Sequence, residues 1–89
     1  MKIKLELFGA SRDFSKKDFL ELEIPDKASI NDLRNEIVQY LDKNFKGNQS
    51  FIKIVKSSAF CSENNEIISD NYKIIKDQKI GIIPPIGGG

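Results

Sequence analysis

One amphipathic helix pattern, in residues 29–47, limits the folds open to this chain. Ser29 is a favourable N-cap, and Asp32 follows three residues later, where an acidic side chain favours the first helical turn. Gly47 stands at the other end as the expected C-terminal cap. Between them the apolar residues recur near the 3.6-residue helical period, as Ile30, Leu33, Ile37, Tyr40, Leu41 and Phe45. A helix with one apolar face must pack on another element, which the rest of the chain has to supply.

Two segments before the helix alternate between apolar and polar residues and predict a β-hairpin. The first covers residues 2–8 and the second residues 18–24, with a loop at residues 9–13 between them. Pro25-Asp26 ends the second strand. The inward residues are expected to be Ile3, Leu5 and Leu7 in the first strand and Leu20, Leu22 and Ile24 in the second. Phe8 breaks the alternation because it falls on the polar face.

Three short strands are expected after the helix, at residues 59–62, 67–68 and 79–83. Residues 63–66 form the turn between the first two, since their asparagines tolerate positive φ. Residues 48–57 stay open, because their period does not decide between a short strand and a helical turn. The order predicts an α+β fold, with one main amphipathic helix across a mixed sheet of four to five strands. At 89 residues we expect one domain, residues 1–83, followed by a flexible tail, residues 84–89.

The composition excludes several classes of site and partner. With one cysteine and no histidine, the chain cannot form a disulfide framework, a Cys/His zinc site or a histidine-dependent nucleophile system. Cys61 is expected to be a small buried hydrophobe. The formal net charge is only +1, with lysines interleaved among acids, so no nucleic-acid partner is expected. No apolar run could span a bilayer and the first residues do not resemble a signal peptide, which predicts a cytoplasmic protein without a membrane partner.

The last ten residues hold the strongest functional clue. An apolar strand runs into Pro84-Pro85, which cannot continue a sheet ladder, and then into Ile86 and Gly87-Gly88-Gly89. Glycine lacks a Cβ, so such an end can enter a passage too narrow for side chains. The alternative is a frayed terminus or a linker without function. The glycines directly follow a strand and a proline pair, which favours the functional interpretation.

This ending resembles the Pro-Pro-apolar-small-Gly-Gly terminus of the small subunit of molybdopterin synthase, a ubiquitin-like sulfur carrier family. Three further segments are similar to that family: its first strand and loop (7–13), its helix opening (29–33) and its Asn-containing hairpin (63–67). Residues 76–80 depart from the family pattern, since Gln78 and Lys79 replace an acid-rich turn, and residues 44–57 match little. The resemblance implies a ubiquitin-like β-grasp in which the last strand lies beside the first.

The resemblance also implies a sulfur-carrier role without a bound cofactor or metal. An adenylating E1-like enzyme would use ATP to activate the carboxylate of Gly89, and a sulfur donor would convert it to a thiocarboxylate. The large synthase subunit, in a heterotetramer, would then pass the sulfur to cyclic pyranopterin monophosphate. In this interpretation Gly89 and Gly88 are the reactive end, and Pro84, Pro85, Ile86 and Gly87 bind the partner. Acid–base catalysis would belong to the partners, so the chain itself is a reagent rather than an enzyme.

A partner-binding surface is predicted from the broken alternation. Phe8 and Ile83 both fall on polar faces, and in a β-grasp their strands are neighbours, so they would form an apolar patch beside the tail. Ile67 would extend it. Alternatively a loop covers these residues, for example the segment around Phe51.

Other functions remain open at this point. A related carrier could serve thiamine synthesis, cysteine synthesis or tRNA thiolation, and a protein modifier would be joined to lysines through Gly89. A β-grasp binding module with an inert tail is the third alternative.

Overall fold

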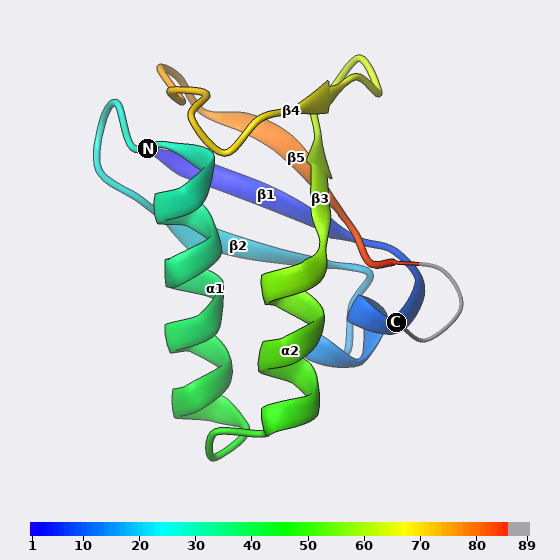
Figure 1. Ribbon diagram of the computed structural model, residues 1–89. Helices are drawn as coiled ribbons and strands as arrows, with labels where there is room; N and C mark the ends of the chain where they lie inside the picture. The colour runs from blue at the N-terminus through cyan, green and yellow to red at the C-terminus, as the bar shows by residue number, and fades with distance from the viewer. Residues whose placement is uncertain (86–89) are drawn as a thin grey trace.

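A mixed five-stranded sheet carries two helices on one face (Figure 1). The structure is a computed structural model and describes residues 1–85. Along the chain the elements are β1 (Lys2–Leu7), the 3₁₀ helix η1 (Gly9–Phe14), β2 (Phe19–Glu23), α1 (Ile30–Asn44), α2 (Gln49–Ser57), β3 (Ala59–Cys61), β4 (Ile67–Ile68) and β5 (Gln78–Ile83). The predicted α+β class is confirmed, and the predicted loop at residues 9–13 forms η1.

The sheet has the strand order β2-β1-β5-β3-β4. β1 pairs antiparallel with β2, as the hairpin pattern predicts, and parallel with β5. β3 then pairs antiparallel with both β5 and β4. The last strand therefore lies beside the first, in the interior of the sheet, and the expected mixed pairing is confirmed.

The core lies between the inner sheet face and the helices. Alternation along β1 and β5 sends every second side chain inward, where the apolar stripe of α1 meets them. Leu22, which the pattern places inward, is only half-buried near the sheet edge. The core residues are Ile3, Leu5, Leu7, Phe14, Leu20, Ile24, Ala28, Ile30, Leu33, Ile37, Leu41, Ile52, Val55, Phe60, Ile74, Ile80 and Ile82.

Helix α1 begins with a reciprocal capping box. The Asp32 N–H donates to Ser29 Oγ at 3.1 Å, and the Ser29 N–H donates to Asp32 Oδ2 at 2.9 Å. The backbone hydrogen bond from Ser29 is the main cause that lowers the pKa of Asp32 below its ordinary value. Because the folded-state pKa is lowered, this contribution to stability is lost as the pH falls through it.

The end of α1 differs by one residue from the prediction. Phe45 is the C-cap, and both Lys46 (φ 53°) and Gly47 (φ 70°) take left-handed conformations. The Gly47 N–H donates to the Asp42 carbonyl at 3.2 Å, the six-residue bond of a Schellman motif. Gly47 therefore closes the motif from its second position, and Lys46 occupies the position expected for glycine.

The open segment 48–57 is helical. The Asn48 side chain accepts a hydrogen bond from the Phe51 N–H at 3.1 Å, which caps α2. The ring of Phe51 lies with its centroid 5.1 Å from those of both Phe14 and Phe45, at the end of the core. Phe45 comes from the end of α1, just before α2, and Phe14 comes from η1, which is distant in sequence, so Phe51 joins three elements.

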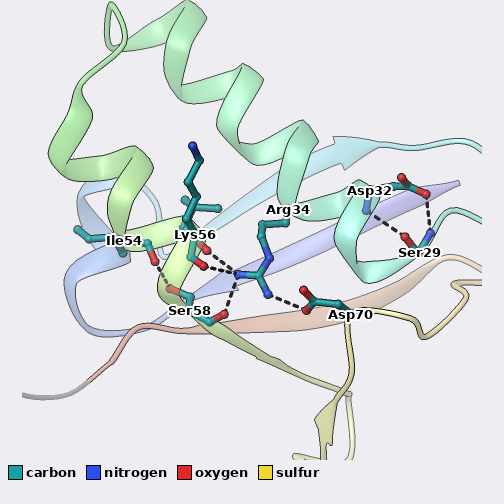
Figure 2. A network of polar contacts seen from close by, with 8 residues as sticks. Ser29, Asp32, Arg34, Ile54, Lys56, Ser58 and Asp70 are labelled. Atoms are coloured by element: carbon teal, nitrogen blue, oxygen red, sulfur yellow. Dashed lines mark hydrogen bonds and ion pairs between the residues drawn. The ribbon is translucent and has the colours of Figure 1, made fainter. Parts of the chain in front are cut away.

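Arg34 ties α1 to α2 and to the loop before β5 (Figure 2). The sequence pattern groups it with the polar face of α1, but its side chain is only 13% exposed. Its guanidinium donates to the Val55 carbonyl at 2.6 Å and the Ser58 carbonyl at 2.8 Å, and to Asp70 Oδ1 at 2.7 Å. A cation at the carboxyl end of α2 also complements the helix dipole. The Arg34 side chain therefore supplies hydrogen bonds to the carbonyls at the end of α2 and also holds the segment around Asp70.

We expect Arg34→Met to lower the free energy of unfolding by about 2–4 kcal/mol, because buried carbonyls lose a charged donor. Urea denaturation at neutral pH measures the difference. Arg12→Met is the matched control, since Arg12 is exposed and should change stability by less than about 0.5 kcal/mol. Equal effects of both substitutions would contradict the role assigned to Arg34.

Candidate functional site

The candidate site begins where β5 leaves the sheet. β5 is paired with β1 up to Ile82 and with β3 up to Ile83, and Pro84-Pro85 follows directly. A Cβ added to Gly9 would lie 3.9 Å from Pro84 Cγ, so the first proline packs beside the start of η1. Pro84 is half-buried and Pro85 exposed. The strand and η1 thus hold the root of the tail in a defined place on the surface.

The remaining predicted tail residues lie outside the part of the chain that the structure describes. These are Ile86, Gly87, Gly88 and Gly89, whose proposed roles in reaction and partner binding stay predictions.

Phe8 lies across β5 on the outer face of the sheet, away from the helices. A Cβ built on Gly81 would be 2.9 Å from Phe8 Cε2 and 2.8 Å from Cys61 Sγ. Both distances are too short for a real contact, so only glycine leaves room for the ring in this place. Phe8 still exposes 39% of its surface. The ring is therefore held against the sheet by one face and offers the other to solvent.

The outer-face patch continues from Phe8 across three strands. Residues directly opposite each other on paired strands have side chains on the same face. The opposite pairs here are Ile83 and Ala59, Gly81 and Cys61, and Cys61 and Ile67. Ile67 is 67% exposed, whereas Cys61 is 6% exposed, as expected for a small buried hydrophobe. We call this surface the outer-face patch, defined by Phe8, Ala59, Cys61, Ile67, Gly81 and Ile83.

The structure brings the predicted surface residues together. Leu7 pairs with Ile82, so Phe8 and Ile83 follow side by side on neighbouring strands. The alternative that the Phe51 segment covers them is wrong, because Phe51 packs with Phe14 and Phe45 on the helical side. That these residues bind a partner stays a prediction.

Sequence reasoning missed the role of Gly81. The alternation within residues 79–83 puts Gly81 on the same face as Ile83, but the sequence assigned this glycine no function. A glycine inside a strand pattern is itself a signal of close approach by another group, and here that group is the Phe8 ring.

An ion pair bounds the patch at the end away from the tail. Lys79 Nζ lies 2.8 Å from Glu6 Oε1, and the Lys79 N–H donates to Glu63 Oε1 at 2.9 Å. The hydrogen bond to Glu6 is the main cause that raises the pKa of Lys79 above its ordinary value. The outer face therefore has a charged end and an apolar end, and the apolar end adjoins the tail.

Neither a protein-family model nor a curated protein matches the chain. Solved structures do. A Pyrococcus furiosus protein described as molybdopterin converting factor, subunit 1, is 24% identical, with a TM-score of 0.69 over 96% of this chain and 98% of its own. The small archaeal modifier protein 1 of H. volcanii is 12% identical, with a TM-score of 0.67 over 96% and 98% of the two chains. A ubiquitin from Caldiarchaeum subterraneum is 18% identical, with a TM-score of 0.62 over 100% and 98%.

The fold is the ubiquitin-like β-grasp. The resemblance in the sequence is thereby confirmed at the level of the fold. Within the described part of this β-grasp, no helix is long and apolar enough to cross a bilayer. Residues 1–85 also contain no group of three or more Cys, Asp or Glu side chains placed to hold a metal ion.

We expect Gly81→Ala to destabilise the β-grasp by about 1–3 kcal/mol, because the new methyl group overlaps the Phe8 ring and Cys61 Sγ. Thermal unfolding measures the loss. Combining it with Cys61→Ala should recover part of the stability, since one of the two overlaps is removed. A double variant that shows no recovery would contradict the crowding seen at this position.

Proposed function

We propose that this chain is a ubiquitin-like sulfur carrier for molybdenum cofactor biosynthesis, acting through the carboxylate of Gly89. The observation that carries the proposal is the placement of Pro84-Pro85 at the end of β5, an interior strand, beside the apolar outer-face patch. A strand hydrogen-bonded on both edges is a firm anchor, and the patch gives a partner apolar surface to bind next to it.

The chemistry needs an electrophilic carbonyl at the end of a slender chain. A carboxylate oxygen of Gly89 attacks the α-phosphorus of ATP in the activating enzyme, and pyrophosphate leaves. Sulfur at the oxidation level of sulfide, supplied by the donor, then attacks the acyl carbon and AMP leaves, which forms the thiocarboxylate without a reductant. In the large synthase subunit the thiocarboxylate sulfur forms a bond to a carbon of the pterin precursor. Water then cleaves the acyl–sulfur bond, which leaves the sulfur on the pterin and restores the carboxylate.

The glycines and prolines of residues 84–89 suit these steps because they make the end of the chain narrow and restrict its root. Gly87, Gly88 and Gly89 have no side chains to obstruct a narrow passage. Pro84 and Pro85 restrict the root of the tail, so less conformational entropy is lost when a partner takes it up. The chain has no histidine, and we assign proton transfer in these steps to the partners.

The similar structures favour two functions of this kind. The P. furiosus protein, described as a molybdopterin converting factor subunit, supports the molybdenum cofactor pathway. The H. volcanii modifier protein supports a second candidate, in which the activated Gly89 carboxylate is joined to the lysines of other proteins. Both functions begin with the same adenylation and differ in the nucleophile that follows.

We expect the protein recovered from cells that retain their sulfur-transfer enzymes to contain a heavier fraction, with one oxygen exchanged for sulfur. Intact-mass spectrometry detects it, and the fraction should be absent from a variant lacking Gly89. Conjugates larger than the free chain on a denaturing gel would favour the modifier. A mass that never changes, even with the activating enzyme and ATP, would refute both.

We expect Phe8→Asp to weaken binding to the large synthase subunit by about tenfold or more while the fold stays intact, because a carboxylate replaces the exposed apolar ring. Isothermal titration measures the affinity. Ile75→Asp is the matched control, since Ile75 is 71% exposed but lies outside the outer-face patch. Unchanged affinity of the Phe8 variant would exclude the patch as the binding surface.

A further inference from the structure

A second surface borders the root of the tail, on its helical side. It is a groove of about 310 Å³ between η1, α2 and the two prolines. α2 contributes four residues at helical spacing, so they form one stripe beside its buried face. We call this surface the tail-root groove, and its lining is Ala10, Ser50, Lys53, Ile54, Ser57, Pro84 and Pro85.

The lining of the groove is mainly apolar with one positive charge. Pro84, Pro85 and Ala10 supply apolar walls, and the proline nitrogens carry no N–H group that would need a partner. The Ser57 hydroxyl donates to the Lys53 carbonyl at 2.9 Å, so its hydrogen atom is already bonded within α2 and does not need a partner in the groove. Lys53 is exposed, and its ammonium group makes no ion pair with any side chain of residues 1–85.

Charge selects the kind of group that fits the groove. None of its lining residues is acidic, and α2 as a whole contains two lysines and no acid. A carboxylate beside an apolar side chain would complement both the ammonium of Lys53 and the apolar walls. The volume is at the lower end of the range for small-molecule sites, and the surrounding surface is open to a protein segment.

The position of the groove indicates which protein supplies that segment. Pro84 and Pro85 belong both to the groove and to the tail, so a protein that binds the tail next to these prolines has the groove within reach. Pro84 also adjoins Gly9, next to Phe8 of the outer-face patch. The two surfaces therefore flank the tail root from opposite sides. The adenylating enzyme is the partner that both the sulfur-carrier and the modifier function require.

We propose that the adenylating enzyme binds the tail-root groove with an acidic–apolar segment whose carboxylate pairs with Lys53. This inference rests on the proposed function, because it assumes that the Gly89 carboxylate is activated. The contact lies outside the reacting atoms, so it serves to dock the carrier rather than to catalyse adenylation.

The test uses the full chain with the adenylating enzyme of the same genome in an ATP–pyrophosphate exchange assay. Lys53→Glu should raise the KM for the carrier by about fivefold or more and leave kcat nearly unchanged, because docking is weakened but the chemistry is not. Lys56→Glu is the matched control, since it makes the same charge change on α2 outside the groove. Its KM should stay within about twofold of the wild type.

A second pair of variants tests the groove by shape. Ser50→Trp fills the groove and should raise the KM for the carrier. Gln49→Trp is its control, because it adds the same side chain one residue away, outside the lining. Equal KM values for Lys53→Glu and the wild type, or equal changes for Lys53→Glu and Lys56→Glu, would overturn the proposed contact while the function stands. A wild-type chain that supports no exchange at all would overturn the proposed function and this inference with it.

Discussion

The parallel pairing of β1 with β5 is the interaction on which the rest of the structure depends. It joins the first and last strands, and its register sets Leu7 opposite Ile82. Since side chains alternate with a period of two, a slip by one residue would turn the core residues of β5 outward. It would also move Gly81 from beneath the Phe8 ring. The core and the outer-face patch thus depend on one register.

That register also places the tail. β5 leaves the sheet beside η1, where Pro84 packs near Gly9, so the outer-face patch lies on one side of the tail root and the tail-root groove on the other. The proposed carrier function needs a slender end that enters other proteins and a body that they can hold. An interior strand meets the second need, because hydrogen bonds on both edges fix it before the tail begins.

The helical side of this arrangement relies on a single arginine. Arg34 reaches from α1 to the last carbonyls of α2 and to Asp70 (Figure 2). Its guanidinium carbon lies 4.9 Å from the centre of the Phe60 ring. Because it fixes the end of α2, it also fixes the neighbouring residues Ile54 and Ser57, which line the tail-root groove. A residue remote from the tail in sequence thereby shapes the surface next to it.

The sequence by itself determined the features that depend on neighbours a few positions away. Alternation identified the strands, and Ser29 with Asp32 marked the start of α1, because both signals are local. Only the tertiary structure decided that residues 49–57 are a helix, since Phe51 packs on Phe14 of η1, which is distant in sequence. It also decided the roles of Gly81 and Arg34. In the sequence a glycine has no side chain to classify, and an arginine is classified only by its charge. The groups that these two residues contact come from distant segments, so they are known only from the folded chain.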